Sequence, residues 1–363
     1  MRITYSIADQ DWLAAKSIGI YNISLGLGRA LAQHPALERL TCLVNSTLPA
    51  DMLSSARTET RIVDVPLRGR WGRIAWDQAG CYRAARRSGN PWLFLPKGFG
   101  SFVQRCPVKL AVYLHDIIIL IYPERYPGVV SRAHYRYFDL TCRQTLRHAD
   151  LVFTNTEFSR REILRWARER KIRCPPVVVA GYGFEPRLSP RPRRDQILVM
   201  VRDVPHKRTD LAVAWTERWR TESGYEGRIL CAGPLPEGLA LPRDPAWVSA
   251  GKVPPKQMIE LMAESRAVVH FTEYEGFGMP PVEAVLAGTP PVYSQIPVAQ
   301  EVMGETGCPF SNEDYGSFSA AMNRALVAAP DEVQSWADAL EQRHNWPQVA
   351  NRVMDALRSF PAN

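Results

Sequence analysis

Short apolar runs rich in β-branched residues alternate with helical patterns along this chain, and this alternation constrains its fold more than any other feature. In the first half we predict strands at Ile3–Ile7, Arg39–Val44, Thr60–Val65, Trp92–Leu95, Val108–Leu114, Leu151–Thr154 and Val177–Ala180. Helical patterns lie between them at Ile20–Gln33, Ile74–Arg87, Ser131–His148 and Ser159–Arg170. Because parallel strands need long crossovers that are usually helices, the pattern predicts an α/β fold with a doubly wound parallel sheet.

The alternation resumes after a turn-rich basic stretch, 181–194, whose glycines and prolines continue neither a helix nor a central strand. Strands are then predicted at Gln196–Val201, Arg228–Cys231, Val248–Ala250, Ala267–Phe271 and Pro291–Tyr293, and helices at Thr209–Arg220, Pro255–Ser265, Pro281–Ala287, Tyr315–Ala328 and Asp331–Gln342. We therefore predict two doubly wound domains, at 1–183 and 196–345, with a linker at 184–195 and a final helix at 346–359. Their ligand is expected in a cleft, where the carboxyl ends of both sheets face each other.

The composition is that of a globular protein, with 46% apolar and 23% charged residues. The longest apolar run, Val108–Tyr122, is broken by His115 and Asp116 and is shorter than the roughly 18–20 residues of a membrane span. The amino terminus begins as a strand, without the apolar region of a secretory signal. Seven cysteines without a C-x-x-C pair favour reduced thiols in a cytoplasmic protein and argue against a zinc site.

Positive charge is concentrated in the first half of the chain. Residues 1–180 hold 27 Lys and Arg against 14 Asp and Glu, a net of +13, whereas residues 181–363 hold 18 against 23, a net of −5. The basic half is therefore the half expected to meet an anionic partner. Nucleic acid, an anionic membrane surface and phosphorylated acceptors all qualify, and a merely solubilising basic surface is the alternative.

The segment Glu275–Glu283 (EGFGMPPVE) places two carboxylates eight positions apart, on either side of a glycine loop and a helix start. The amides of Gly276, Phe277, Gly278 and Met279 can approach a diphosphate, because glycine leaves room for the ligand and a helix start attracts anions. The two prolines that follow lack an N–H, so the anion must lie on the loop side of them. A nucleotide-sugar, with a diphosphate between two polyols, fits this pattern. A purely structural strand-to-helix turn is the alternative.

The longer segment 275–292 (EGFGMPPVEAVLAGTPPV) resembles the signature of retaining glycosyltransferase family 4, whose members have two Rossmann-like domains in the GT-B fold. The resemblance continues in 295–304 (QIPVAQEVMG), and upstream in 113–117 (YLHDI), 153–160 (FTNTEFSR) and 201–208 (VRDVPHKR). It runs in family order from about residue 110 to the end, and the first 100 residues match only in outline. It also implies that the final helix packs back on the N-terminal domain.

The resemblance implies that Glu275 binds hydroxyls of the donor sugar and that Glu283 binds the ribose. Arg202 and Lys207 are expected to stabilise the negative charge that grows on the leaving diphosphate. Two fixed cations could do this without a metal, so neither a metal nor another cofactor is expected. Each assignment has an alternative. Glu275 could be a solvated loop residue, and Glu283 could complement the helix dipole. The two cations could be surface charges on an exposed loop.

His115 follows an apolar strand, and the resemblance places it near the anomeric carbon of the donor. A structural histidine with satisfied hydrogen bonds is the alternative. Asp116 either orients His115 or caps the next turn. Gly19, in the loop and helix start after the first strand, stands where relatives carry a glycine pair at the donor phosphates. The Gly26–Gly28 pair lies inside a helical pattern and is therefore not interpreted as a dinucleotide motif.

The acceptor is assigned to the basic N-terminal half. The stretch 67–76 (LRGRWGRIAW) places two tryptophans among arginines and leads into a helix that carries Arg83, Arg86 and Arg87. This pattern resembles an interfacial anchor and suits a polyprenyl-diphosphate-linked acceptor and peripheral association with the inner face of the cytoplasmic membrane. An ordinary amphipathic surface helix is the alternative.

We thus predict a retaining, metal-independent hexosyltransferase of bacterial surface polysaccharide synthesis. It would move mannose or glucose from a nucleotide-diphosphate sugar to a glycan or lipid-linked acceptor. Front-face substitution is favoured, because a Glu275 bound to distal hydroxyls is poorly placed as a nucleophile. A nucleotide-sugar epimerase of the same fold, an inactive relative and a basic nucleic-acid-binding protein are the alternatives. The last is disfavoured, and no nucleic-acid partner is expected, because no nucleic-acid-binding motif is present.

Overall fold

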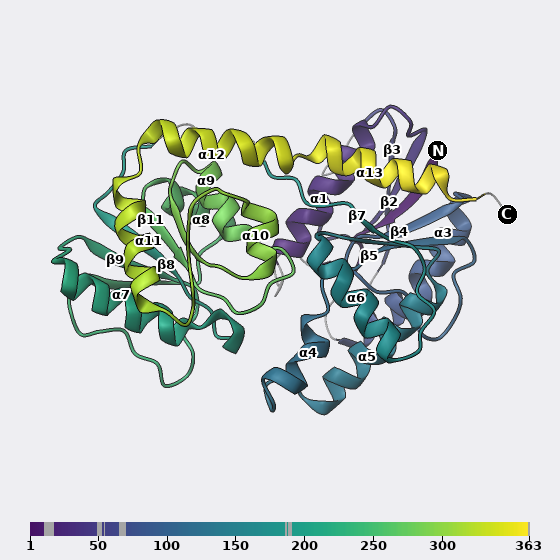
Figure 1. Ribbon diagram of the computed structural model, residues 1–363. Coiled ribbons are helices and arrows are strands. Elements are labelled where there is room, and N and C mark those ends of the chain that lie inside the picture. Colours follow the sequence, from purple (N-terminus) through teal and green to yellow (C-terminus); the bar gives the residue numbers. More distant parts are fainter. Residues whose placement is uncertain are drawn as a thin grey trace. The chain divides into compact units, whose positions relative to one another are not determined.

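A computed structural model describes residues 1–10, 18–48, 53, 55–64, 70–185, 187 and 191–361 of the chain. The chain divides into two compact units (Figure 1). Unit 1 comprises Met1–Phe184 and His344–Asn363, and unit 2 comprises Glu185–Arg343. Of the expected linker, Pro186 and residues 188–190 lie outside the described residues.

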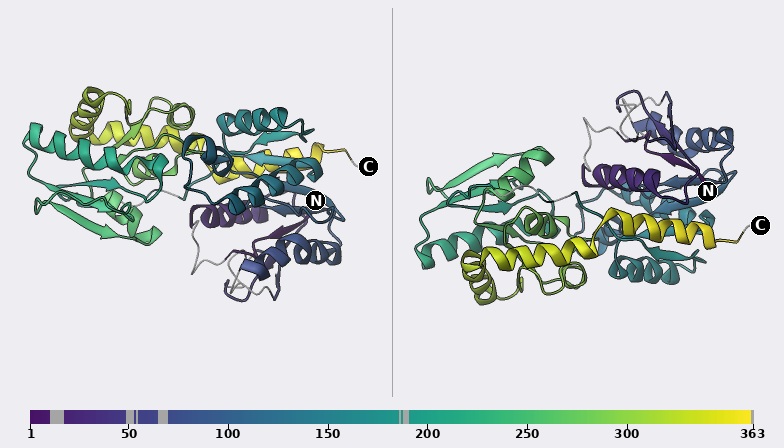
Figure 2. Two further views of the ribbon diagram at one scale, coloured as in Figure 1. Left: turned by 90° about the horizontal axis from the view of Figure 1, so that it is seen from below. Right: turned by 90° about the horizontal axis from the view of Figure 1, so that it is seen from above.

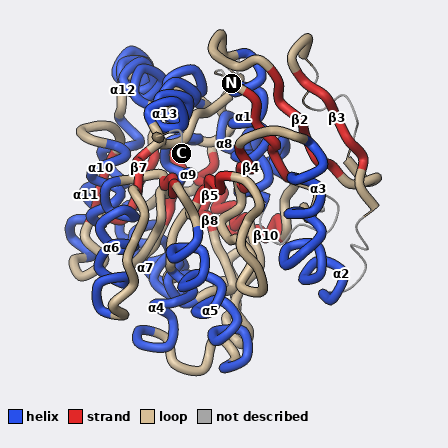
Figure 3. Tube along the Cα trace, turned by 90° about the vertical axis from the view of Figure 1, so that its right-hand side faces the viewer, coloured by secondary structure: helices blue, strands red, loops and turns tan. Residues whose placement is uncertain are grey.

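Unit 1 is built on a seven-stranded sheet in the order β3-β2-β1-β4-β5-β6-β7, in which each described pairing is parallel. Its strands are β1 (Arg2–Ser6), β2 (Arg39–Val44), β3 (Thr58–Ile62), β4 (Trp92–Leu95), β5 (Lys109–Tyr113), β6 (Leu151–Thr154) and β7 (Val177–Val179). Figure 3 shows this sheet from its edge strand β3 inward. The central strands are buried throughout, as expected for a parallel sheet covered on both faces.

The helices of unit 1 are α1 (Ile18–Gln33), α2 (Arg70–Ala75), η1 (Trp76–Gly80), α3 (Cys81–Ser88), α4 (Ile118–Arg125), α5 (Arg132–His148), α6 (Glu157–Glu169) and α13 (Trp346–Ser359). The C-terminal α13 packs along α1 (Figure 1). The Trp346 ring lies so close to Gly26 and Gly183 that an added Cβ would come within 2.1 and 2.5 Å of it. Gly26, inside α1, therefore serves helix packing, since any larger side chain would displace the ring.

Two predicted features of unit 1 need correction. The single helix expected at Ile74–Arg87 is three consecutive helical segments, and the middle one, η1, is a π-helix. Such segments are rare and often occur at functional sites. The short helix α4, which contains Pro123 inside it, was not predicted, because a proline normally ends a helical pattern.

Unit 2 carries a six-stranded sheet in the order β10-β9-β8-β11-β12-β13, again with parallel pairings. Its strands are β8 (Gln196–Met200), β9 (Arg228–Ala232), β10 (Trp247–Gly251), β11 (Ala267–His270), β12 (Pro291–Ser294) and β13 (Cys308–Phe310). Its helices are η2 (Pro205–Lys207), α7 (Thr209–Ser223), α8 (Pro255–Ala263), α9 (Met279–Leu286), α10 (Pro297–Met303), α11 (Tyr315–Val327) and α12 (Pro330–Arg343). The sequence did not predict β13, which tolerates Pro309 because it is an edge strand.

Stacked aromatic side chains fill the sheet core of unit 1. The rings of Tyr5 and Phe94 lie 5.5 Å apart, and the rings of Phe94 and Phe153 lie 5.5 Å apart, across β1, β4 and β6. In unit 2, Phe271 packs 4.5 Å from Phe310 and 5.2 Å from Phe318. Both cores lie next to the carboxyl ends of the central strands, so they hold the loops at that edge in place.

Each sheet has one point where the strand order reverses. In unit 1 it lies between β1 and β4, and in unit 2 between β8 and β11. Crossover helices leave the sheet on opposite faces at such a point, so the loops at the carboxyl ends diverge and leave room for a ligand. The ribbons of both units in Figure 2 have helices on each side of the sheet. The fold thus offers one ligand position in each unit.

Within the described residues, no helix combines the length and the apolar character that a membrane crossing requires. The same part of the chain contains no group of three or more His, Cys, Asp or Glu side chains arranged to hold a metal ion.

Candidate functional site

In unit 2, the loops after β8 and β11 are joined to each other at the strand-order reversal. The backbone N–H of Glu273 donates to the carbonyl of His206 at 2.7 Å, and the Thr272 hydroxyl donates to the same carbonyl at 3.2 Å. The Arg208 guanidinium adds an ion pair to Glu273. The two loops therefore form one rigid platform on which the predicted donor-binding residues lie.

The ammonium of Lys207 and the carboxylate of Glu275 are in direct contact across these loops. Their side chains are 17% and 16% exposed, so the pair is largely shielded but reachable from solvent. Nε2 of His270 lies 3.5 Å from the same carboxylate oxygen. Burial lowers the pKa of His270 well below its usual value, and the charge of Lys207 adds to this effect. His270 is therefore neutral, and Lys207 is the cation that faces Glu275.

The glycine loop ends at Gly278, whose φ of 85° and ψ of 62° lie in the left-handed region that favours glycine. Helix α9 begins at Met279, two residues before the predicted start, with Pro280 and Pro281 in its first turn. Their missing N–H groups cost nothing there, because the first turn has no intrahelical acceptors. The N–H groups of Gly278 and Met279 donate to no group in the part of the chain that the structure describes. They are thus available to an anion.

The carboxylate of Glu283 lies on α9, two positions further into the helix than predicted. Because the helix starts at Met279, Glu283 is its fifth residue, and the first turn contains no acidic residue. The suggestion that Glu283 complements the helix dipole from the first turn is therefore wrong. Burial raises the pKa of Glu283 to about 7. Among the described residues its carboxylate makes no hydrogen bond or ion pair, which leaves it free to accept hydroxyls.

Arg202 lies two residues after the end of β8, at the same edge of the sheet. Its backbone is held by Thr209, whose hydroxyl accepts from the Arg202 N–H at 3.1 Å and donates to the Arg202 carbonyl at 2.8 Å. Its side chain is exposed and forms no ion pair within the described ranges. The structure therefore anchors the residue and leaves its guanidinium in solvent.

In unit 1, the imidazole of His115 is buried and both of its nitrogens are engaged. Nε2 lies 2.7 Å from the carbonyl of Pro96, and Nδ1 lies 2.6 Å from the hydroxyl of Tyr182. A carbonyl only accepts, so Nε2 carries the proton and Nδ1 accepts from Tyr182. The Tyr182 oxygen in turn accepts from the Asn155 side-chain amide at 2.8 Å. Burial lowers the pKa of His115 to about 4, so this imidazole is neutral near pH 7.

The next two predicted residues lie at helix starts in unit 1. Asp116 accepts the backbone N–H of Ile118 at 3.0 Å and so caps the start of α4. Gly19, expected in the loop and helix start after the first strand, is the second residue of α1 and is exposed there. Residues 11–17 lie outside the described residues.

Three polar residues that the sequence analysis did not select lie together at the strand-order reversal of unit 1. Asp9 follows β1, Lys97 follows β4, and Asp77 lies on η1. The signal that could have found them is positional. Charged residues shortly after predicted parallel strands lie at the ligand-binding edge.

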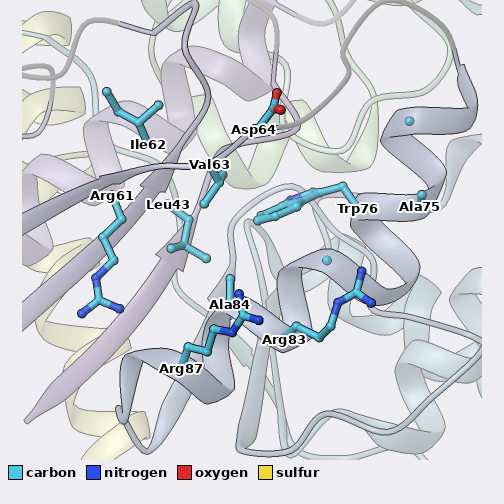
Figure 4. Close-up of a pocket in the computed structure, with 12 residues that line it drawn as sticks. Leu43, Arg61, Ile62, Val63, Asp64, Ala75, Trp76, Arg83, Ala84 and Arg87 are labelled. Atoms are coloured by element: carbon cyan, nitrogen blue, oxygen red, sulfur yellow. The ribbon is translucent and has the colours of Figure 1, made fainter.

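The basic stretch that begins before α2 lines a pocket of about 480 Å³. Figure 4 shows Arg83 and Arg87 of α3 on one side of it and Leu43, Val63 and Trp76 around it. Neither arginine forms an ion pair among the described residues. Residues 67–69 and the side chain of Trp71, which were part of the predicted anchor, lie outside the described part.

Known proteins resemble this chain in both sequence and fold. Residues 248–345 match the family described as "Glycosyl transferases group 1". The chain is 24% identical over 281 residues to the O-antigen chain mannosyltransferase B of Escherichia coli. The matched region covers 67% of this chain and 68% of that protein.

Among solved structures, a sucrose-phosphate synthase from Thermosynechococcus elongatus superposes with a TM-score of 0.68 at 16% identity, covering 99% of this chain and 98% of the other. Anabaena Alr3699/HepE, in complex with UDP and glucose, superposes with a TM-score of 0.68 at 17% identity, covering 99% and 100%. The predicted fold is thereby confirmed, as two Rossmann-like parallel sheets of the GT-B type. Together with the family match, these similarities support a glycosyltransferase. Membership of family 4 and the paired-glutamate interpretation stay predictions.

Proposed function

We propose that this protein is a retaining glycosyltransferase that moves a hexose from a nucleotide-diphosphate sugar to a glycan or lipid-linked acceptor in surface polysaccharide synthesis. The observation that carries the proposal is the platform in unit 2. There, the Lys207–Glu275 pair lies at the strand-order reversal, in the same loop system as the available amides of Gly278 and Met279.

The donor diphosphate would bind at the start of α9. Two available N–H groups, the positive end of the helix dipole and the Lys207 ammonium all favour an anion at this point. Glu283 would accept the ribose hydroxyls, which needs its ionised form. Arg202, anchored through its backbone and free at its guanidinium, would add a second cation to the diphosphate.

The Lys207–Glu275 contact links the sugar to the leaving group. Glu275 would accept hydroxyls of the transferred hexose, while Lys207 faces the diphosphate. As the glycosidic bond breaks, negative charge grows on the leaving oxygen, and a fixed, partly desolvated cation stabilises the transition state more than the ground state. We therefore propose that the reaction needs no metal. Undiminished turnover in excess EDTA is the expected result, and restoration of a lost activity by Mg²⁺ would contradict it.

Front-face substitution is the mechanism proposed for retention of configuration. Glu275 is paired with Lys207 and committed to sugar hydroxyls, which makes it a poor nucleophile, and the leaving phosphate would take the acceptor proton. His115 would act through position rather than through proton transfer, because its neutral imidazole is fully hydrogen-bonded. A trapped covalent glycosyl-Glu275 intermediate would overturn this mechanism.

Mannose is the sugar we propose for the donor. The support is the similarity to a protein named O-antigen chain mannosyltransferase B. A structural neighbour is titled as a complex with UDP and glucose, so glucose is the competing donor.

The test is thermal-shift screening with GDP-mannose, UDP-glucose, UDP-N-acetylglucosamine and the bare nucleotides, followed by product analysis with and without acceptor. We expect the largest stabilisation with GDP-mannose and transfer only when acceptor is present. Conversion of the nucleotide-sugar without any acceptor would favour an epimerase. Stabilisation by none of the nucleotides would refute the proposal. A Lys207→Met variant, expected to lose about 10²–10³-fold in kcat, ties the activity to this site.

A further inference from the structure

A cluster of three charged side chains lies in unit 1 outside the residues assigned to the donor. The ammonium of Lys97 contacts a carboxylate oxygen of Asp9 and lies 3.5 Å from a carboxylate oxygen of Asp77. Asp9 is 2% exposed, whereas Lys97 and Asp77 are 22% and 25% exposed. Asp9 therefore forms the buried floor of the cluster, and Lys97 and Asp77 form a rim that solvent can reach.

The position of the cluster in the fold is that of a ligand site. Asp9 follows β1 and Lys97 follows β4, and the strand order of this sheet reverses between these two strands. In unit 2, the Lys207–Glu275 pair occupies the equivalent place, after β8 and β11. Each unit thus carries a lysine–carboxylate pair on the two loops that diverge to make room for a ligand.

The loop that carries Asp9 is held by residues other than the cluster itself. The side-chain amide of Asn45, after β2, donates to the carbonyls of Ala8 and Gln10, both at 2.7 Å. The Gln10 amide donates in turn to the Ser24 hydroxyl of α1 at 3.0 Å. On the other side, Lys97 follows Pro96, whose carbonyl binds His115. The carboxylate and the ammonium are therefore placed by the scaffold, as a preorganised site requires.

Fold stability alone does not account for this cluster. A buried ion pair seldom stabilises a fold more than apolar side chains of similar size, because desolvation offsets the attraction. Two carboxylates also share one ammonium, so one of them lacks a full partner. Burial raises the pKa of Asp77 to about 7 and lowers the pKa of Lys97 to about 7. Because the Lys97 side chain is shared with Asp9 and lies 3.5 Å from Asp77, the Asp77 carboxylate has room to accept a further hydrogen bond.

We infer that Asp9, Asp77 and Lys97 bind the hydroxyl groups of the acceptor sugar, an inference that rests on the glycosyltransferase function proposed above. Carboxylates accept hydrogen bonds from hydroxyls, and an ammonium donates to them. The excess of carboxylate over ammonium disfavours a phosphate group at this point. The ligand class is therefore a neutral polyol, bound with its hydroxyls toward the rim formed by Asp77 and Lys97.

The π-helix η1 explains how one short segment serves two surfaces. Trp76 lines the basic pocket beside Arg83, whereas the next residue, Asp77, reaches Lys97. A π-helix has a wider turn than an α-helix and so changes the direction of successive side chains relative to the regular pattern. Asp77 therefore faces Lys97, while Arg83 and Arg87 line the pocket.

The test measures sugar binding separately from donor binding. Ligand-observed NMR with a panel of methyl glycosides (mannose, glucose, galactose, N-acetylglucosamine and rhamnose) is recorded with the donor nucleotide diphosphate present. In the wild type we expect at least one glycoside to bind in the millimolar range. In Asp77→Asn we expect its Kd to rise at least tenfold, while the thermal shift caused by GDP or UDP stays unchanged.

A double variant, Asp9→Asn with Lys97→Met, distinguishes binding from folding. The two charges of the Asp9–Lys97 pair are removed together, so neither residue is left as a buried charge without its partner. We expect the unfolding transition of unit 1 to match the wild type while glycoside binding is lost. The control is Arg143→Gln, which breaks an ion pair to Asp139 on α5 and should leave binding unchanged.

Unchanged glycoside affinity in Asp77→Asn, or no binding of any glycoside to the wild type, would overturn the inference. If neither GDP nor UDP raised the unfolding temperature of the wild type, the proposed function would be refuted instead.

Discussion

Replacing His115 with Gln should make the protein less sensitive to acid. Glutamine offers one donor toward Pro96 and one acceptor toward Tyr182 but cannot be protonated. Burial lowers the pKa of His115 from 6.5 to about 4, so between these values the unfolded chain takes up a proton that the folded chain does not. Stability from this residue is fully present above pH 6.5 and is lost as the pH falls toward 4.

The size of the effect follows from the shift. Each pKa unit corresponds to about 1.4 kcal/mol, so His115 should remove about 3 kcal/mol of unfolding free energy between pH 6.5 and 4. His206 and His270 also have lowered pKa values. Their contribution is the same in wild type and variant, so it cancels when the two proteins are compared.

The assay is urea unfolding, followed by tryptophan fluorescence at several pH values between 4 and 7.5. The difference in stability between His115→Gln and wild type should change by about 3 kcal/mol in favour of the variant as the pH falls across this range. Parallel pH profiles for the two proteins would refute the assignment of a neutral, buried imidazole. The pH dependence of kcat gives an independent check, because an imidazole that stays neutral across this range adds no ionisation to the kcat profile. A limb of the kcat profile near pH 6–7 that vanishes in the variant would also refute it.

Further predictions concern the two glutamates, the glycine loop and the basic pocket. Glu275→Gln should lower kcat by about 10²-fold while nucleoside diphosphate binding is kept or strengthened, because Lys207 loses its competing partner; unchanged kcat would count against the proposed role. Donor affinity should improve as the pH rises through about 7, where Glu283 ionises. Glu283→Gln should weaken donor binding and make KM for the donor less dependent on pH, which a series of KM measurements across this pH range checks. Gly278→Ala should destabilise unit 2 by about 1–2 kcal/mol, because alanine is strained at a φ of 85°. Steric overlap does not contribute, since the atom nearest to the added Cβ is 3.7 Å away. Thermal unfolding of this variant measures the cost. Replacing Arg83 and Arg87 with Gln should reduce co-sedimentation with anionic liposomes at low salt, and equal sedimentation of both proteins would remove membrane association from this surface.

Local patterns in the sequence were enough to predict the sheets. The strands at Arg39–Val44, Trp92–Leu95 and Leu151–Thr154 have the predicted bounds, because continuous apolar runs flanked by polar residues and turns are typical of buried parallel strands. The helix ends were less accurate. Helix α9 starts earlier than predicted because prolines are tolerated anywhere in a first turn, so they mark its region but not its first residue.

The sequence by itself therefore determined the α/β architecture and was enough to propose the donor-site motif, since both depend on residues close together in the chain. It did not determine the pairing of Lys207 with Glu275 or of Lys97 with Asp9, because the two partners of each pair follow different strands. Only the sheet order brings these loops together, at the point where the order reverses. The protonation state of His115 was likewise decided by tertiary structure, because its burial, its hydrogen bond to the Pro96 carbonyl and the hydrogen bond it accepts from Tyr182 exist only in the folded unit.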